Sequence, residues 1–426
     1  MVYRITESGW RRKQNAGLII KDWGHGIKIV MNRMSPTPSE IGLKGYRLIR
    51  YERKSELLVF VEPILRRPKA CPCCGSVRLH SKGRYRRKVR HLESFGRYSR
   101  LIVLCRRFFC TQCRHSFVQP LPGIMPGRHC SEPFRERVYR DHHEGICGSR
   151  LAILAGLGTA TIERIYAQFT SRKAKERLSR NCPEILGIDE HTLHKRCRFA
   201  TTFCDLKRHR VFDVVEGKSA QSLEAFLLSL KGRDKVRVVC IDLSSSYRAL
   251  IKRYFPNAKI VADRFHVIRL MQHHFMELFR QIAPQVGARN GLLAALRKRP
   301  DKLSPNQARK LEILFQAHPA AHTIYDQMQR LGSLLRRRHQ TARQCRRLAP
   351  RLLHITRQLA DSGFSSLATL AKTLTTWSAE IACMWRFTKN NGITEGFHRK
   401  MKLIQRRAYG FKNFKNYRLR VIAQCG

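Results

Sequence analysis

The sequence predicts a multi-domain α+β protein, in which a small cysteine-rich module and a pair of helices precede an α/β domain that a long helical segment interrupts. Three observations predict this architecture. Two Cys-x-x-Cys pairs stand early in the chain, at residues 71–74 and 110–113. From residue 184 short apolar segments alternate with helical patterns, and residues 272–386 then lose almost every strand signal. A chain of 426 residues is long enough for about two or three domains.

The net charge indicates a polyanionic partner. Lysine and arginine number 84 against 30 aspartate and glutamate, a formal charge of +54, and the cations spread over the whole length. A fold with that charge repels itself unless a polyanion neutralises it, so nucleic acid is the first partner to expect. The alternative is a ribosomal-type or merely basic protein.

Apolar runs and cysteine usage indicate the compartment. No apolar run reaches the ~20 residues that a bilayer-spanning helix needs, and the first residues lack the apolar core of a signal peptide, so no membrane partner is expected. The 15 cysteines are an odd number, and several stand singly in apolar strands, as Cys204 and Cys240 do. This usage suits a reducing cytosol with one metal site better than a disulfide framework.

The two cysteine pairs predict a zinc ribbon. Four thiolates from two knuckles give the closed tetrahedral site that structural Zn²⁺ prefers. The expected ligands are Cys71, Cys74, Cys110 and Cys113. Cys73 and Cys105 stay open as substitutes, and a set of buried or reactive free thiols is the alternative. The cationic run at residues 84–92, between the pairs, suits phosphate contact unless it is only a solvated face.

A helix-turn-helix is predicted within residues 149–166. A helix, a turn at Gly156–Gly158 and a second helix capped by Thr159 follow one another there. The second helix would present three side chains to a DNA groove, namely Thr161, Arg164 and Gln168. An ordinary helical hairpin is the alternative.

The α/β domain begins near residue 184. Strands are expected at 184–189, 198–205, 210–215, 235–243 and 258–263, with helices at 219–231, at 244–254 and from about residue 265. Three close strands followed by helix, strand, helix and strand is the order of the ribonuclease H-like fold. In that fold the first and fourth strands are neighbours, and by this analogy Asp189 would lie beside Asp242.

Three acids stand where a metal-dependent site would need them. Asp242 follows a nearly unbroken apolar run, and Asp189 likewise ends an apolar strand. Glu395 is the one acid in the cationic stretch 394–407. Phosphodiester hydrolysis and transfer of a 3′ hydroxyl both need an activated nucleophile and a stabilised leaving oxygen, which two Mg²⁺ ions about 3.5–4 Å apart can provide. We therefore expect Asp189, Asp242 and Glu395 to be catalytic and to hold Mg²⁺ or Mn²⁺.

Other acids compete for places in this site. Glu190 follows Asp189 directly, and alternate strand residues face opposite ways, so only one of the two points into the site. Asp189 is preferred because it ends the strand just before two polar residues. Asp263 also ends a strand, and residues 263–266 could line the site or merely cap the next helix. Any one acid could instead be a capped or salt-bridged residue.

The last helix combines its acid with cations. Glu395 shares one helical face with Arg399, Lys402 and Arg406, while apolar positions face the core. One acid beside three cations fits a metal ligand with DNA phosphates alongside it. These three cations are therefore predicted to contact DNA.

Three segments resemble bacterial insertion-sequence transposases of the ISL3 family. They are LGIDE at 186–190, VCIDLSSSYRALIKRYFPNAKIVADRFHVIRLM at 239–271 and NGITEGFHRKMKLIQRRAYGFKNFKNYRLRV at 391–421. The cysteine pairs and the helix-turn-helix also fall where that family has its zinc-binding and DNA-binding modules. The resemblance implies a DDE transposase that binds the terminal inverted repeats of an insertion sequence and performs Mg²⁺-dependent strand cleavage and transfer. The acids of the triad match Asp189, Asp242 and Glu395.

The expected organisation has six parts: an N-terminal extension of poor order at 1–40, the zinc ribbon at 41–122, the helix-turn-helix and linker at 123–180, the first part of the ribonuclease H-like domain at 181–271, an all-helical insertion at 272–386 and the rest of the catalytic domain at 387–426. We expect the protein to form homo-oligomers on double-stranded DNA, at the element ends and at the target. Its expected location is the bacterial cytoplasm, at the nucleoid. Two alternatives are a DNA-binding regulator with an inactive transposase fold and a nuclease or RNA-processing enzyme on the same fold.

Overall fold

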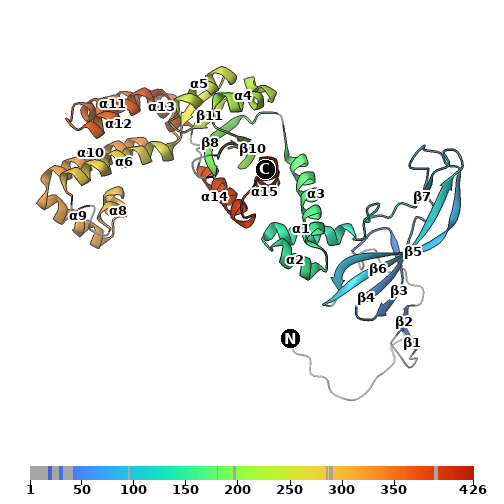
Figure 1. The fold of residues 1–426 in the computed structure, drawn as a ribbon. Coiled ribbons are helices and arrows are strands. Elements are labelled where there is room, and N and C mark those ends of the chain that lie inside the picture. Colours follow the sequence, from blue (N-terminus) through green and yellow to red (C-terminus); the bar gives the residue numbers. More distant parts are fainter. Residues whose placement is uncertain are drawn as a thin grey trace, which may run out of the picture. The chain divides into compact units, whose positions relative to one another are not determined.

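The computed structural model forms two compact units, residues 1–169 and 170–426 (Figure 1). It describes residues 18–21, 28–31, 42–94, 96–179, 181–194, 198–284, 286, 291–387 and 392–426. The expected extension at 1–40 lies outside the described residues, apart from β1 (Leu18–Lys21) and β2 (Lys28–Met31), which pair with each other. None of the described helices combines the length and the apolarity that crossing a membrane requires.

A twisted antiparallel and parallel sheet forms most of the first unit. Its strands are β3 (Tyr46–Arg53), β4 (Leu57–Pro63), β5 (Leu79–Ser94), β6 (Arg97–Cys110) and β7 (Ser116–Val118). They lie in the order β3-β4-β6-β5, with β7 paired to β6. The long β5–β6 hairpin buries alternate residues such as Val89, Leu101 and Val103 on one face. The cationic run 84–92 lies within β5.

Three helices complete the first unit: α1 (Glu132–Glu144), α2 (Gly148–Ala155) and α3 (Thr159–Arg177), the last of which crosses into the second unit. Their core contains Phe134, Tyr139, Leu151, Ile162 and Phe169. Gly156 ends α2 in the left-handed conformation at φ +57, and a Cβ there would lie 2.4 Å from Arg90 Nη1. A glycine is therefore required at this turn, which is the turn that the sequence predicts.

A five-stranded sheet is the centre of the second unit. Its strands are β8 (Ile185–His194), β9 (Arg198–Asp205), β10 (Arg210–Glu216), β11 (Val238–Ile241) and β12 (Lys259–Ala262), in the order β10-β9-β8-β11-β12. The first and fourth strands, β8 and β11, are parallel neighbours, as expected. All four residues of β11 are buried. The strand is shorter than the predicted 235–243 because a 3₁₀ turn, η1 (Arg233–Lys235), precedes it.

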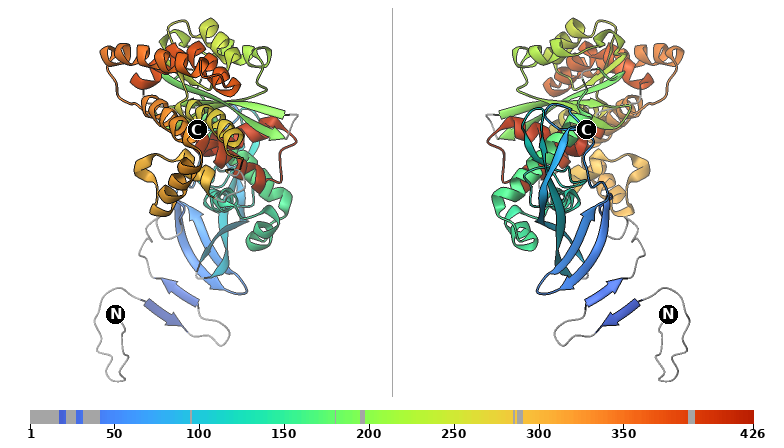
Figure 2. Two further views of the ribbon diagram at one scale, coloured as in Figure 1. Left: turned by 90° about the vertical axis from the view of Figure 1, so that its left-hand side faces the viewer. Right: turned by 90° about the vertical axis from the view of Figure 1, so that its right-hand side faces the viewer.

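Helices cover the sheet and continue into the segment that the sequence predicts to be helical. Beside the sheet are α4 (Ala220–Ser229), α5 (Ser245–Tyr254), α6 (Arg264–Ile282), α14 (Gly392–Arg407) and α15 (Phe414–Cys425). The described residues of 272–386 form no strand, and their further elements are α8 (Leu292–Arg297), η2 (Pro300–Lys302), α9 (Pro305–Ala317), α10 (Pro319–Leu335), α11 (Ala342–Ala360), α12 (Ser365–Thr376) and α13 (Ser378–Arg386). Helix α10 lies against α6, and α11 lies against α12 (Figures 1 and 2).

The predicted boundary at residue 272 falls inside α6. Buried residues follow one another along this helix at helical spacing, from Val267 through Met271 to Phe275 and Phe279. One continuous apolar stripe therefore carries the chain from the sheet into the helical segment, and no local break marks the change.

Two arginines fasten the helical segment to the sheet. Arg248 on α5 forms an ion pair of 2.7 Å with Glu380 and stacks over the Trp377 ring at 3.7 Å. Arg264 at the start of α6 donates to the carbonyls of Arg337 and Met384, at 3.0 and 2.6 Å. These contacts fix the long helical segment relative to the ends of β11 and β12.

Helix α15 is held on the sheet by a bidentate ion pair. Arg418 Nε and Nη2 each lie 2.6 Å from an oxygen of Asp213 on β10. The Asp213 side chain is 5% exposed, so its charge has lost most of its hydration and depends on this partner.

Asp213→Asn should destabilise the second unit. We expect the free energy of unfolding to fall by about 2–3 kcal/mol, less than the ~3–5 kcal/mol for a fully buried pair because Arg418 is 31% exposed. Urea unfolding of the full chain, followed by the fluorescence of Trp377 and Trp385, measures this. Glu184→Gln is the control, since it removes only exposed, solvent-screened pairs and should change the stability much less. Equal effects of the two variants would contradict the role of the Asp213 pair.

Candidate functional site

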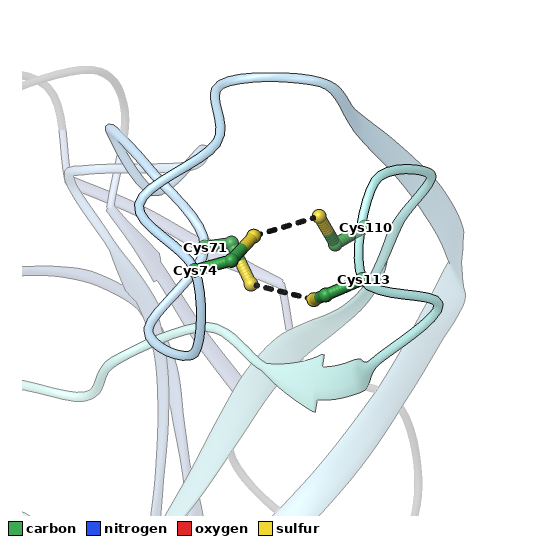
Figure 3. Close-up of side chains that lie close together, drawn as sticks. All are labelled: Cys71, Cys74, Cys110 and Cys113. Carbon is green, nitrogen blue, oxygen red and sulfur yellow. Dashed lines mark hydrogen bonds between the residues drawn. The ribbon is translucent and has the colours of Figure 1, made fainter.

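Four cysteine thiols converge between the knuckles of the first unit (Figure 3). Cys71 Sγ lies 3.6 Å from Cys113 Sγ, and Cys74 Sγ lies 3.6 Å from Cys110 Sγ. All four sulfurs lie within 4.8 Å of one another. Four sulfurs at ~2.3 Å from a central Zn²⁺ would stand roughly 3.8 Å apart, so this arrangement is that of a structural zinc site.

The backbone of each knuckle prepares its sulfurs for a metal. The Cys71 amide donates to the Ser76 carbonyl at 2.8 Å, and the Cys110 amide donates to the His115 carbonyl at 2.9 Å. The backbone amides of Cys113 and then Gln112 donate to the Cys110 sulfur and lower its thiol pKa to about 6. A thiolate is the form that binds zinc, so this position is ready for the metal near neutral pH.

The two substitute cysteines are not part of this cluster. Cys73 is exposed, and Cys105 is fully buried in the sheet core of the first unit. Burial raises the pKa of the Cys105 thiol, which keeps it protonated and inert. The four ligands are therefore those that the spacing predicts.

Cys71→Ser or Cys110→Ser should release the zinc and unfold the ribbon, since such modules gain most of their folding energy from the metal. Mass spectrometry of the intact native protein and limited proteolysis across residues 67–113 measure the two effects. Cys73→Ser is the matched control and should retain one zinc ion per chain. A wild-type protein that is metal-free and still protease-resistant in this segment would contradict the assignment.

In the second unit, three acids lie at one level of three adjacent parallel strands. Asp242 and Asp263 directly follow β11 and β12, whereas Asp189 lies in the middle of β8, which continues to His194 and does not end at Asp189 as the sequence predicted. Gly187 pairs with Cys240, so Asp189 and Asp242 each lie two residues beyond that pair. Ile241 pairs with Ala262, so Asp242 and Asp263 each lie one residue beyond this second pair. Because residues at the same level of adjacent parallel strands lie side by side, the three carboxyl groups meet where β11 and β12 end.

The electrostatics confirm how close these groups are. Burial first, and then the carboxylates of Asp242 and Asp263, raise the pKa of Asp189 to about 7, against the lowering effects of His266 and of the Glu190 amide. Burial also raises the pKa of Asp242. Asp242 Oδ1 is buried and finds no hydrogen-bond partner within the described part of the chain. A bound cation would satisfy this oxygen and relieve the repulsion, so these residues fit a divalent metal.

Asp263 both caps a helix and faces the site, the two roles that the sequence leaves open. Its Oδ1 accepts from the Phe265 amide at 3.3 Å at the start of α6, and its Oδ2 lies 2.8 Å from His266 Nδ1. The hydrogen bond with Asp263 raises the pKa of His266, and the carboxylates of Asp189 and Asp242 act in the same direction. Both oxygens of Asp263 are thus already engaged, whereas Oδ1 of Asp242 has no partner in the described residues.

Glu190 belongs to the other face of β8, as strand alternation predicts. It hydrogen-bonds the Tyr247 hydroxyl, and its Oε2 lies 3.9 Å from Lys218 Nζ. Its carboxylate nevertheless raises the pKa of Asp242, so it lies within electrostatic range of the site.

Glu395 lies on α14, and its carboxylate does not join the cluster of acids at the sheet. Its Oε1 accepts from Arg399 Nη2 at 2.9 Å, and its side chain is 43% exposed. One turn later on the same helix, His398 Nδ1 lies 3.6 Å from Asp189 Oδ2. Within the described ranges, only the four cysteines form a group of at least three metal-ligating side chains whose ligand atoms all lie within 4.8 Å.

A buried polar chain behind Asp189 is a feature that sequence reasoning missed. Thr202 Oγ1 lies 3.0 Å from His191 Nδ1 and 3.1 Å from His398 Nε2, and His191 Nε2 lies 2.7 Å from the Tyr417 hydroxyl. Burial lowers the pKa of His191 to about 3 and that of His398 to about 4, so both imidazoles are neutral. Neutral rings tie α14 and α15 to β8 and β9 without adding charge beside the acids.

The side chains that are predicted to contact DNA differ in how far other residues of the protein already engage them. On α3, Thr161 and Arg164 share one face and bond to each other at 3.1 Å. Gln168, in contrast, bonds to Arg135 of α1 and contacts Met125, so it helps to pack the helices together. On α14, Arg399 is paired with Glu395, whereas the side chains at the two later positions are exposed, namely Lys402 and Arg406.

The cationic run of β5 is divided between packing and solvent. Arg90 Nη1 donates to the Gly156 carbonyl at 2.6 Å, and Arg87 donates to the Arg128 carbonyl. The exposed cations of the run are Arg84, Arg86 and Lys88. Part of this run therefore holds the helices of the first unit, and part faces solvent.

Comparisons with known proteins match the regions that contain the two groups of residues. Residues 186–421, which include the three predicted catalytic acids, match the family model of the ISL3 DDE transposases, described as a transposase. Residues 67–113, which include the four cysteines, match a model described as the zinc-finger of transposase IS204/IS1001/IS1096/IS1165. The transposase for insertion sequence element IS1001 of Bordetella parapertussis is 28% identical over 407 residues, which are 90% of this chain and 96% of that protein.

Proposed function

The chain belongs to the ISL3 family of DNA transposases, and we propose that it cuts DNA at the terminal inverted repeats of an insertion sequence and joins the ends to a target by Mg²⁺-dependent strand transfer. One observation carries the proposal. Asp189 and Asp242 lie at the same level of the adjacent parallel strands β8 and β11, and Asp242 keeps a buried oxygen that nothing in the described residues satisfies. The order β10-β9-β8-β11-β12 supports a ribonuclease H-like domain.

The acids of the second unit would hold the metal. Asp189 and Asp242 offer oxygens at the sheet edge, and Glu395 on α14 completes the set once its helix moves closer or its bond to Arg399 opens. Mg²⁺ or Mn²⁺, when bound, supplies charge stabilisation for the attacking and leaving oxygens of a phosphodiester. Asp263 positions His266 through a hydrogen bond. The uncharged hydrogen-bonded side chains that connect His398 to Tyr417 keep Asp189 in place.

DNA would be bound by several parts of the chain. The zinc ribbon and the helices α2 and α3, a helix-turn-helix with Thr161 and Arg164 on its open face, would recognise the element ends. Arg399, Lys402 and Arg406 would contact phosphates beside the acids. We propose that homo-oligomers bring two ends together with the target, at the nucleoid in the bacterial cytoplasm.

Removing the charge of any one acid should abolish cleavage. Asp189→Asn, Asp242→Asn and Glu395→Gln should each lower the rate of Mg²⁺-dependent nicking of end DNA by a factor of about 10³ or more, because each removes a metal ligand. Binding to end DNA should remain near the wild-type affinity, because other modules provide it. A gel assay with labelled end DNA measures both quantities.

Asp234→Asn is the control for the acid variants, since Asp234 is exposed and lies before the start of β11, at the end of the strand opposite to Asp242. Near wild-type nicking by one acid variant would remove that residue from the triad. A wild-type protein that binds the ends specifically and never nicks them would indicate a DNA-binding regulator with an inactive fold.

Binding should depend steeply on salt, and the helical segment should contribute. Exposed arginines on α11 form no salt bridge within the described residues, namely Arg343, Arg347 and Arg351. Each phosphate contact that is lost should reduce the slope of log K against log salt by about 0.9. Replacing all three by Ala should therefore flatten the slope measurably, whereas the control Lys231→Ala/Lys235→Ala should change it less. An unchanged slope would mean that this charge serves another purpose.

A further inference from the structure

The second unit contains a hollow of about 780 Å³ that the proposed chemistry does not use. It lies between the start of β9, the end of β10 and the start of α15. The side chains that line it include Arg198, Glu216, Lys412, Phe414, Lys415 and Arg418. Cations thus dominate its walls, and one aromatic ring provides an apolar surface.

The hollow keeps two uncompensated positive charges. Arg198 Nη2 lies 2.5 Å from Glu216 Oε1, and Arg418 is bound to Asp213, so these two guanidinium groups are neutralised. Lys412 and Lys415 are exposed and form no salt bridge within the part of the chain that the structure describes. The hollow therefore attracts an anion, and two ammonium groups suit two successive phosphates.

The sheet register places the hollow on the same face as Asp189. Asp189 pairs with Thr202, and Arg198 lies four residues before Thr202 on β9, so their side chains share one face. Glu216 pairs with Ala200 and belongs to that face as well. Arg198 pairs with His194, five residues beyond Asp189, a distance of about 16 Å along β8. This span equals about five nucleotides at the ~3.4 Å rise of a duplex.

Helix α15 holds the hollow at a fixed distance from the acids. Tyr417 bonds to His191, two residues after Asp189, and Arg418 bonds to Asp213 on β10. Both anchors follow Phe414 and Lys415 within one helical turn. Lys415 on α15 therefore cannot move along the sheet independently of the catalytic edge.

We infer that this hollow binds the single-stranded DNA that continues from the cleaved position, with Lys412 and Lys415 on its phosphates and a base against Phe414. The inference rests on the proposed function, because it takes Asp189 as the place of cleavage. A positively charged groove with an aromatic platform is the combination that binds single strands without sequence preference. Duplex DNA would present its bases stacked inside the helix, where Phe414 could not reach them.

The test measures binding without added Mg²⁺, so that it does not depend on cleavage. Fluorescence anisotropy of the full-length, zinc-loaded protein compares end DNA that carries a single-stranded extension with the same end DNA as a blunt duplex. Lys412→Ala/Lys415→Ala should weaken binding of the extended DNA by about tenfold. The salt slope should fall by about 1.4, which is 0.7 for each of two single-strand phosphates. Affinity for the blunt duplex should stay within about twofold of wild type.

Two further measurements make the test specific. Lys252→Ala removes an exposed lysine on α5 and should leave both affinities unchanged. A photoreactive base in the extension should crosslink to the peptide that contains Phe414. Equal losses for the extended and blunt DNA, or a crosslink elsewhere in the chain, would overturn the inference. If nicking fails while the extension-specific loss and the crosslink are present, the proposed catalysis falls and the single-strand site stands.

Discussion

The carboxylates that follow β11 and β12, together with that of Asp189 beside them on β8, are the constraint around which the second unit is built. Parallel pairing brings Asp189, Asp242 and Asp263 to one edge, where burial and mutual repulsion raise the pKa of Asp189 to about 7. Apolar residues at these three positions would avoid the cost of burying carboxylates that repel one another, yet all three positions carry acids. It relieves the charge only in part, through the bond from Asp263 to His266, and leaves Asp242 Oδ1 without a partner in the described residues. A site that remains unsatisfied in this way is prepared for a cation.

The rest of the unit serves to hold distant segments against that edge. Residues of α14 and α15 lie some two hundred positions after β8, yet His398 reaches Asp189 and Tyr417 reaches His191. The long helical segment lies between α6 and α14 in the sequence. Arg248 and Arg264 bind residues near its end and hold it beside β11 and β12. The two buried imidazoles are neutral, so the contacts that position the helices do not compete with a metal for the acids. The residues that position the helices are therefore different from the carboxylates that would bind the metal.

Local patterns in the sequence predicted much of this. The apolar run before Asp242, the two cysteine pairs and the turn at Gly156 are each written in a few neighbouring residues, and the structure contains all three features. The sequence did not predict the chain from His398 through Thr202 to His191, because its members are polar residues that only the folded sheet brings together. It also predicted Gln168 as a DNA contact without showing its bond to Arg135, which depends on how α1 packs on α3. The predicted boundary at residue 272 falls inside α6, because the apolar stripe of this helix continues through that residue.

The central claim is that the acids of the second unit bind a divalent metal, and metal binding can be measured without DNA or catalysis. Electron paramagnetic resonance of Mn²⁺ titrated into the full-length protein counts bound ions, with the cysteine site already filled by zinc. The account predicts that the wild-type protein binds Mn²⁺ and that Asp242→Asn binds fewer ions or binds them far more weakly, because it removes the unsatisfied oxygen of the site. Equal Mn²⁺ binding by the two proteins would contradict the account.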